Sequence, residues 1–344
     1  MAPKNDTFLA ACRREKVAYT PVWLMRQAGR YMEEYRRLRA RFAFLELCKR
    51  PDLACEIAVT AVQRLGVDAA ILFSDILLLL EPLGRGLVYT DGDGPVFEQP
   101  VRSGADLDSV QEFEPEEALA CVFEAVRQTR AALAGKIPLI GFAGAPFTLA
   151  SYLIEGRGSR SFALTKQFIN ADSGAWRALM ERLVGLLVTY LNGQICAGAQ
   201  VVQIFDSWVG CLAPDDYRTH VLPHMRVLFS KLDPTVPVIH FTTGTGGMLE
   251  LIRAAGGTII GLDWRVDLDA AWERVGYDVG VQGNLDPVAL LGSRAEVRRR
   301  TEEILQRACG RPGHIFNLGH GVLQDTPVDN VVALVDAVHE LSAR

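Results

Sequence analysis

The feature that most constrains the fold of this chain is a regular alternation between short apolar runs and longer segments with helical periodicity. Eight runs occur, and each is almost continuous in apolar and β-branched residues. This composition is typical of strands buried on both faces, as in a parallel sheet covered by helices. The runs are residues 22–24, 69–73, 138–142, 201–205, 236–241, 258–262, 279–282 and 314–318.

The segments between these runs have the spacing of amphipathic helices. Between Pro51 and Gly66, apolar residues recur every four positions, with proline near the start and glycine after the end. Similar periodicity predicts helices over 118–133 and 175–194. Near the C-terminus, Thr326 is expected to cap the last helix.

Eight strands alternating with helices predict an α/β fold, the (β/α)8 TIM barrel. A doubly wound open sheet is the competing fold, but it would need a glycine-rich phosphate-binding turn after its first strand, and none is present there. We expect a single barrel domain over 1–344, because barrels of this length are common. An N-terminal extension (about 1–20) and a top-face excursion (about 78–108), with a hairpin around residues 91–95, complete the prediction.

Composition narrows the classes of function. The chain has 344 residues, 49% of them hydrophobic, and a formal net charge of −5, which argues against a nucleic-acid partner. Seven scattered cysteines with no C-x-x-C pair favour a reducing compartment. The N-terminus has no apolar signal core, and the most apolar run, 69–80, is too short to span a membrane. We therefore expect a cytoplasmic protein with no membrane partner.

Polar residues follow several of the predicted strands, at the end of a barrel where active sites lie. Such residues often only cap the next helix. Asp75 differs, because apolar runs flank it on both sides and an isolated carboxylate in apolar surroundings is costly. It is either a buried structural partner or a group that awaits a ligand. The residues at strand ends are Ser74, Asp75, Asp206, Ser207, Asp263, Asn284 and His320.

Two arginines follow the first run. Arg26 and Arg30 are four residues apart, so they would share one face of a helix, or Gly29 would let the backbone turn if the segment is a loop. Paired guanidinium groups suit carboxylate ligands. The alternative is a pair of surface ion pairs with Glu33 or Glu34.

No metal site is predicted. Residues 91–94 resemble the start of a calcium loop, but Pro95 occupies its fifth position. His220 and His224 have a spacing that can bind metal, yet the intervening Pro223 breaks the helix.

Seven long motifs resemble those of the uroporphyrinogen decarboxylase family, in the same order along the chain. The resemblance runs from about residue 21 to the C-terminal helix and includes the sequence MRQAGRY at 25–31. It implies a single distorted (β/α)8 barrel, a homodimer, and a reaction without a cofactor. That reaction removes carbon dioxide from the four acetate side chains of uroporphyrinogen III and yields coproporphyrinogen III. The motifs are 21–31, 73–77, 138–148, 205–208, 261–264, 282–287 and 317–321.

The resemblance also implies roles for particular residues. Asp75 would accept hydrogen bonds from the pyrrole N–H groups at the centre of the macrocycle, and its charge would stabilise a pyrrole ring protonated at carbon. Arg26 and Arg30 would hold substrate carboxylates, with Gln27 lining the site. The source of the proton stays open between Arg26, a water molecule and a substrate carboxyl. Further polar contacts would come from Tyr152, Ser207 and His320, and apolar walls from Phe142 and Phe205.

Two alternatives remain. The first is a corrinoid-linked methyltransferase of the same superfamily, which would need a thiolate-rich zinc site. Here residues 240–242 read His-Phe-Thr and residues 317–321 contain no cysteine, so neither place offers a thiolate. The second is a tetrapyrrole carrier without catalysis, which would use Arg26 and Arg30 but would not need a carboxylate such as Asp75 at the ring centre.

Overall fold

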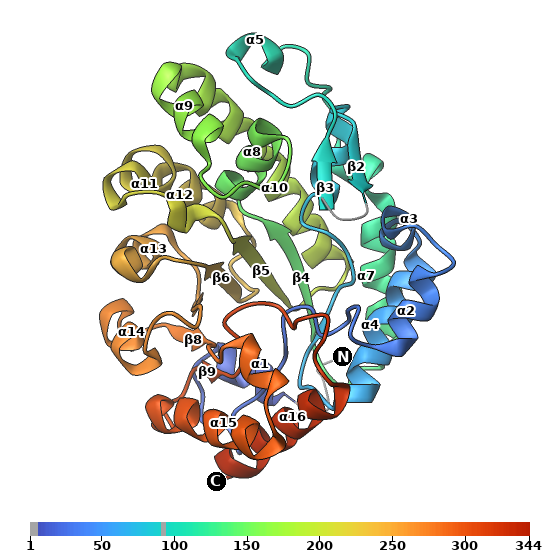
Figure 1. Cartoon of the computed structure of the whole chain (residues 1–344), viewed down its shortest axis with the longest axis vertical. Coiled ribbons are helices and arrows are strands. Elements are labelled where there is room, and N and C mark those ends of the chain that lie inside the picture. The colour runs from blue at the N-terminus through green and yellow to red at the C-terminus, as the bar shows by residue number, and fades with distance from the viewer. Residues whose placement is uncertain (1–5, 91–93) are drawn as a thin grey trace.

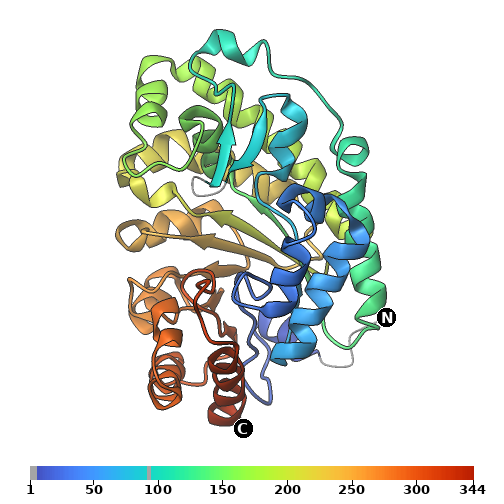
Figure 2. The ribbon, with the colours of Figure 1, turned by 45° about the vertical axis from the view of Figure 1, so that its right-hand side comes forward.

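The computed structural model of the chain describes residues 6–90 and 94–344, and it shows an α/β fold built on one curled parallel sheet (Figure 1). Seven parallel strands follow one another in the order β1-β4-β5-β6-β7-β8-β9. Helices lie around the outside of this sheet (Figures 1 and 2). The strands are β1 (Ala70–Ile71), β4 (Leu139–Gly144), β5 (Val201–Asp206), β6 (Val238–Thr242), β7 (Ile259–Gly261), β8 (Gly280–Gln282) and β9 (His314–Ile315).

The predicted helices over 51–65, 118–133 and 175–194 are confirmed, with small shifts of their ends. The predicted cap of the last helix is wrong: that helix begins at Val328, so Pro327 and not Thr326 precedes its first residue. The α-helices are α1 (Thr7–Cys12), α2 (Glu33–Arg39), α3 (Phe44–Lys49), α4 (Pro51–Leu65), α5 (Gly104–Leu107), α6 (Pro115–Ala118), α7 (Ala120–Ala132), α8 (Pro146–Glu155), α9 (Ala163–Ala171), α10 (Ser173–Ala197), α11 (Pro214–His220), α12 (Leu222–Lys231), α13 (Leu249–Ala255), α14 (Leu268–Val275), α15 (Arg294–Ala308) and α16 (Val328–Ser342). Short 3-10 helices are η1 (Leu78–Leu83), η2 (Val209–Cys211), η3 (Gly246–Met248) and η4 (Pro287–Leu291).

The first predicted strand, 22–24, is the exception among the eight. It makes a single parallel bridge from Val22 to Phe316, beyond β9, and on its other side the Val22 carbonyl accepts the Asp68 N–H at 2.8 Å. The Val22 N–H donates to the Asp68 carboxylate at 2.8 Å, and the Leu24 N–H donates to the Gln27 side chain at 3.2 Å. Because side chains take these backbone donors, the segment lies between the two edges of the sheet without forming a regular strand.

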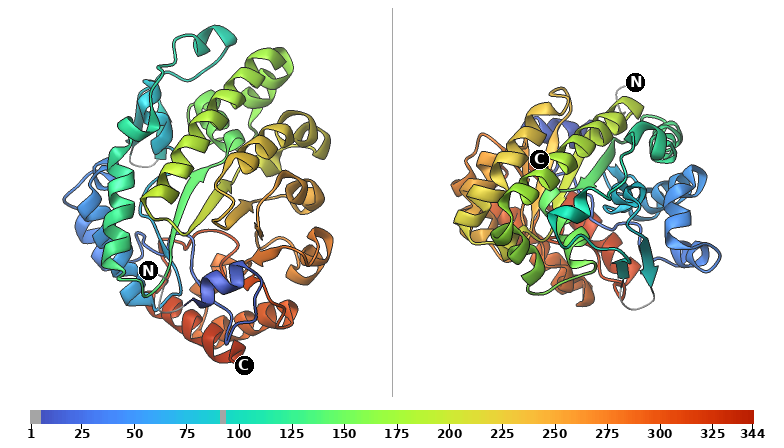
Figure 3. Two further views of the ribbon diagram at one scale, coloured as in Figure 1. Left: turned by 180° about the vertical axis from the view of Figure 1, so that it is seen from behind. Right: turned by 90° about the horizontal axis from the view of Figure 1, so that it is seen from above.

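One end of the sheet interior is covered by α1. Phe8 and Cys12 of this helix share a buried cluster with the first residues of several strands, including Val201 and Ile259. Figure 3 shows α1, in dark blue, in front of the sheet in the view from behind, close to the C-terminal helices. The other end, where the strands finish, is therefore the end available for a site.

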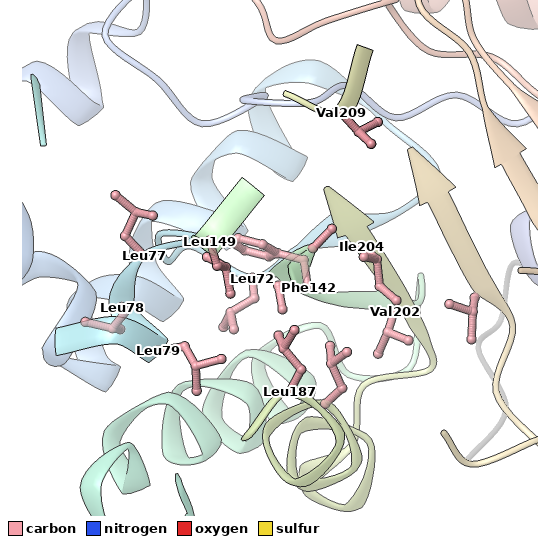
Figure 4. Packing of buried hydrophobic residues seen from close by; sticks show 14 of the residues in the cluster. Leu72, Leu77, Leu78, Leu79, Phe142, Leu149, Leu187, Val202, Ile204 and Val209 are labelled. Carbon is pink, nitrogen blue, oxygen red and sulfur yellow. The ribbon is translucent and has the colours of Figure 1, made fainter. Parts of the chain in front are cut away.

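A second and larger core lies between the sheet and the surrounding helices. Figure 4 shows Leu79 of η1, Phe142 of β4 and Leu187 of α10 among the side chains that fill the space between the sheet and the helices. These side chains are buried, and burying one such side chain stabilises the fold by about 1.5–3 kcal/mol.

The predicted excursion over 78–108 contains η1, a two-stranded hairpin and α5. The hairpin pairs β2 (Leu87–Thr90) with β3 (Gly94–Phe97) in antiparallel register, as predicted for this region. Residues 91–93, at its tip and within the sequence that resembles a calcium loop, lie outside the described residues. Within the described ranges, no helix is both long and apolar enough to cross a membrane.

Candidate active site

The residues expected to form the site lie at or after the carboxyl ends of the parallel strands. Asp75 follows β1, Ser207 follows β5 directly, and His320 follows β9. Phe142 and Phe205 lie on the adjacent strands β4 and β5. Since these strands are parallel, their carboxyl ends meet at the same end of the sheet.

Arg26 lies in an irregular loop that side chains hold in place. Its φ of 60° is in the left-handed region, which a non-glycine residue rarely adopts outside strained or functional positions. The preceding Met25 N–H donates to the Asn317 side chain at 3.1 Å. Gln27 is buried, and its amide donates to the Ala69 carbonyl at 3.2 Å while accepting the Leu24 N–H. These two hydrogen bonds of Gln27 thus hold the loop that carries Arg26 in position.

Both loop arginines are exposed, and neither forms an ion pair with any residue in the described ranges. Glu33, one of the two partners that the alternative prediction named, pairs with Arg37 at 2.5 Å. Arg26 packs against the segment after β9, because a Cβ added at Gly321 would lie 2.4 Å from the Arg26 Cδ. Its positive charge also lowers the pKa of Asp75 and Tyr152, which places these groups near it. Arg30 has no such effect on the other predicted site residues.

Asp75 is a half-buried carboxyl in the surroundings that the sequence predicts. Its Oδ1 accepts the Leu77 N–H at 2.8 Å. Burial raises its pKa, while the Tyr89 hydroxyl, the Leu77 N–H and the Arg26 charge act in the opposite direction. The nearby positive charge and the burial of Asp75 thus have opposite effects on its pKa.

Tyr89 is a site residue that sequence reasoning missed. It lies on β2 of the hairpin, and its ring packs against Phe44 with the ring centres 4.9 Å apart. Its hydroxyl is buried and makes no hydrogen bond of good geometry to any described residue, although burial and the nearby Asp75 both raise its pKa. The only signal in the sequence was an aromatic residue inside the predicted excursion over 78–108.

Aromatic rings form an apolar wall on neighbouring strands. Phe142 and Phe205 meet edge to face at 5.6 Å between ring centres, and Phe205 meets Phe241 of β6 at 5.8 Å. Phe142 is buried and Phe205 is partly exposed. The two predicted aromatic residues are therefore brought together, and Phe241 extends the wall.

Tyr152 contacts Trp208, the residue that follows Ser207 in the chain. Tyr152, on α8, stacks on the Trp208 ring with centres 3.7 Å apart. Beneath them, Asp206 is fully buried and accepts the Thr148 hydroxyl at 2.8 Å. Burial raises the pKa of Asp206 to about 7. Asp206, which the sequence marked only as a polar residue at a strand end, supports the segment that carries Ser207.

His320 lies beside two arginines. Burial, together with the positive charges of Arg26 and Arg265, lowers its pKa to about 4, although the Asp263 charge acts in the opposite direction. The imidazole is therefore neutral near pH 7 and can offer one donor and one acceptor. The Trp264 ring meets it edge to face at 6.2 Å between centres.

The candidate site thus combines an exposed arginine, Arg26, a half-buried carboxyl, Asp75, that lies near it, and aromatic residues on the neighbouring strands. Such a set suits an anionic ligand with an apolar body. Among the described residues, no group of three His, Cys, Asp or Glu side chains is arranged to hold a metal ion. His240, on β6, is buried, and neither of its ring nitrogens makes a hydrogen bond of good geometry to a described residue.

Two cavities lie elsewhere in the fold. One, of about 420 Å³, is lined by residues of α14, η4 and α15, and the other, of about 580 Å³, lies between residues 111–115 and α10. Of the polar residues predicted at strand ends, Asn284 lines the first cavity, and none of the residues given a substrate or catalytic role lines either one.

Comparison with known proteins agrees with the geometry. A family model described as "Uroporphyrinogen decarboxylase (URO-D)" matches residues 3–341. Uroporphyrinogen decarboxylase from Carboxydothermus hydrogenoformans is 56% identical over 340 residues, which cover 98% of this chain and 97% of that protein. The same enzyme from Sorangium cellulosum is 56% identical over 338 residues, covering 98% and 97%.

Among solved structures, a methyltransferase from Methanosarcina mazei has a TM-score of 0.84 and covers 99% of both chains. At 21% sequence identity, this likeness shows the fold alone. With the family match over nearly its whole length and relatives at 56% identity, the chain belongs to the uroporphyrinogen decarboxylase family.

Proposed function

We propose that this protein removes carbon dioxide from the four acetate side chains of uroporphyrinogen III and releases coproporphyrinogen III. The observation that carries the proposal is Asp75, a half-buried carboxyl placed near Arg26, which has no ion-pair partner among the described residues. A carrier would need the arginines alone, so the carboxylate favours an enzyme. Relatives with 56% identity bear the name of this activity.

Asp75 fits the centre of the macrocycle. An ionised carboxylate offers about four lone-pair sites, and a porphyrinogen presents four pyrrole N–H donors. Among the described residues, one group, the Leu77 N–H, makes a hydrogen bond of good geometry to this carboxyl. The remaining capacity is free to accept N–H groups from the substrate.

The charge of Asp75 serves the chemical step. When a pyrrole carbon takes up a proton, the ring becomes positive and can accept the electron pair of the breaking carbon–carboxylate bond. A carboxylate held nearby stabilises that developing charge without reorganising. The incoming proton would come from a water molecule or a substrate carboxyl, because the Arg26 guanidinium is a very weak acid.

The other residues bind and orient the substrate. Arg26 and Arg30 would hold carboxylates, and Phe142 and Phe205 would face the apolar edge of the macrocycle. Tyr152, Ser207 and neutral His320 would supply hydrogen bonds to the side chains. Gln27 would act indirectly, because its hydrogen bond to the Ala69 carbonyl holds the loop that carries Arg26.

We further propose the finer features of the assembly. Residues 21–24 occupy the eighth position of a distorted (β/α)8 barrel, and Trp23 supports this, because its indole N–H donates to Gln282 inside the sheet at 2.8 Å. The chain would form one domain over 1–344, act as a homodimer and work in the cytoplasm without a cofactor.

The test is an anaerobic assay with uroporphyrinogen III and the purified protein. We expect carbon dioxide to be released, and mass spectra of the oxidised products to show stepwise loss of four carboxyl groups. Tight binding with no loss of carboxyl groups would replace the enzyme by a carrier. Stoichiometric zinc together with methyl transfer to a corrinoid would instead favour the methyltransferase alternative.

A further inference from the structure

We propose that Arg265 is an additional substrate-binding residue of this site and holds a peripheral carboxylate of the porphyrinogen. The proposal rests on the function proposed above and extends it to a residue that sequence reasoning did not single out. It would complete a ring of cations of which Arg26 is another member.

The segment after β9 places Arg265 beside the site. A Cβ added at Gly319 would lie 2.3 Å from the backbone nitrogen of Trp264, the residue before Arg265. A Cβ added at Gly321 would lie 2.4 Å from the Arg26 Cδ. One three-residue segment therefore touches both places. His320, between these glycines, experiences the positive charge of both arginines.

The Arg265 side chain is held in place before any ligand arrives. Its Nη1 donates to the buried Asp263 carboxylate at 2.7 Å, and its guanidinium stacks on the Trp264 ring at 3.9 Å from the centre. Asp263 is itself anchored, because it accepts the Gly244 N–H at 2.7 Å. Preorganisation of this kind lowers the entropy that binding must overcome.

The ion pair with Asp263 leaves most of the guanidinium available. The Arg265 side chain is 53% exposed, and within the described ranges its Nε and Nη2 donate to no protein group. An arginine has five N–H donors in a planar fork, so it can keep one partner and bind a carboxylate with the others.

The local charge favours an anionic ligand. Arg26 and Arg265 both lie near His320, and Asp263 neutralises only one of them, so a net positive charge remains at this rim. A porphyrinogen carries carboxylates around its periphery, which is the chemistry that such a rim would recognise. Because Arg265 is exposed, we assign it to a side-chain carboxylate at the outer edge of the macrocycle.

Arg265→Gln tests the proposal, with Arg311→Gln as the matched control. Arg311 is also stacked on an aromatic ring, that of Tyr277 at 4.7 Å, but both residues precede strands and lie at the opposite end of the sheet. We expect Arg265→Gln to raise KM for uroporphyrinogen about 10-fold or more, as the loss of a charge-assisted contact would, with kcat within about twofold. Arg265→Lys should recover part of the loss, and Arg311→Gln should leave KM unchanged.

A binding measurement separates this proposal from the proposed activity. Fluorescence titration with uroporphyrin, the oxidised octacarboxylate, should show about 10-fold weaker binding to Arg265→Gln than to the wild type, with less salt dependence. Failure of the wild type to release carbon dioxide would overturn the proposed function alone. Unchanged KM and unchanged porphyrin affinity in a folded Arg265→Gln protein would overturn the role of Arg265. A lower Tm with an unchanged KM, in either Arg265 variant, would also overturn the proposal, because it would show that Arg265 only stabilises the fold through its ion pair with Asp263.

Discussion

At the scale of single residues, Asp75 shows how a sequence can reveal a functional group through its neighbours. The apolar runs on both sides predict a carboxyl in apolar surroundings, and the structure places it there, half-buried and with its pKa raised. The neighbours in sequence did not reveal which groups stabilise the ionised carboxyl against the effect of burial. Arg26, in a loop, and Tyr89, in a hairpin, both lower the pKa of this carboxyl, and only the folded chain brings them near it.

Asp75→Asn tests the charge of this residue while preserving its shape. The amide oxygen can still accept the Leu77 N–H, so we expect Tm to change little. The loss of the negative charge should lower kcat by about 100-fold or more, the usual cost of removing one preorganised electrostatic partner. Circular dichroism with a decarboxylation assay measures both. A folded variant with near-normal turnover would contradict the role of Asp75.

Arg26 illustrates a limit of prediction at the same scale. Its motif and its spacing from Arg30 were visible in the sequence, but both a helix and a loop were compatible with them. The structure shows a loop in which Arg26 itself, and not Gly29, adopts the left-handed conformation. This conformation is set by contacts with Asn317 and Ala69, which are remote in sequence and have no periodic signal.

At the scale of elements, the β2–β3 hairpin contributes to the site through Tyr89. The hydroxyl of this residue lowers the pKa of Asp75. In Tyr89→Phe, that pKa should rise, so at mildly acidic pH a larger fraction of Asp75 would be protonated and inactive. We expect the acidic limb of the kcat/KM profile to move to higher pH, with activity below the limb falling a few-fold.

Val88→Thr is the control for this change, because Val88 is the exposed neighbour of Tyr89 on the same strand. It should leave the pH profile unchanged. The Tyr89→Phe protein should keep its Tm or gain slightly, since the deleted hydroxyl is buried and has no hydrogen-bond partner of good geometry in the described structure. An unmoved acidic limb would show that Tyr89 does not tune Asp75.

The segment after β9 offers a second test, with two glycines only two residues apart. A Cβ at Gly321 would meet the flexible side chain of Arg26, whereas a Cβ at Gly319 would meet the Trp264 backbone at 2.3 Å. Gly321→Ala should therefore keep the fold but displace Arg26 and raise KM several-fold. Gly319→Ala should destabilise the protein by about 1–3 kcal/mol. Equal thermal unfolding curves for the two variants would refute this distinction.

Prediction of the helices and strands succeeded where hydrophobic periodicity dominates. It failed where side chains, and not the backbone of a neighbouring strand, accept the backbone N–H groups. Helix α4 begins at Pro51 and ends before Gly66, as the sequence indicates. The run 22–24 has the composition of a strand, but Asp68 and Gln27 take two of its N–H groups. These hydrogen bonds depend on acceptors that are distant in the chain or lie in an irregular loop. The pattern of a short sequence segment therefore does not predict them.

At the scale of the whole molecule, the net charge of −5 conceals a separation of charge. Arg26 and Arg265 lie near His320 at the rim of the site, whereas many acidic residues form ion pairs with other arginines. The total argues against a nucleic-acid partner, but it averages over the whole surface and does not describe the charge at the rim of the site. A local cluster can steer an anion although the protein as a whole is acidic.

The pH dependence of stability is also a property of the whole molecule, because buried titrating groups on several strands contribute with opposite signs. Burial lowers the pKa of His240, on β6, to about 4. Below pH 6.5 the unfolded chain therefore binds a proton that the folded chain excludes, and the free energy of unfolding falls as the pH is lowered toward 4. Asp206 acts oppositely: its pKa is raised to about 7, so the stability that it contributes is present at low pH and is lost as the pH rises through 7.

His240→Phe isolates the first of these contributions. The ring packs against Phe229 at 5.0 Å and has no hydrogen bond of good geometry to lose, so the substitution should be tolerated near pH 7.5. Between pH 6.5 and 4, the wild type should lose a few kcal/mol more than the variant, because the pKa of His240 is about 4 in the folded chain and near its ordinary value in the unfolded chain. Urea unfolding at a series of pH values measures the difference. Asp206→Asn should change the slope with the opposite sign, and parallel curves for the wild type and His240→Phe would show that His240 does not titrate as a buried group.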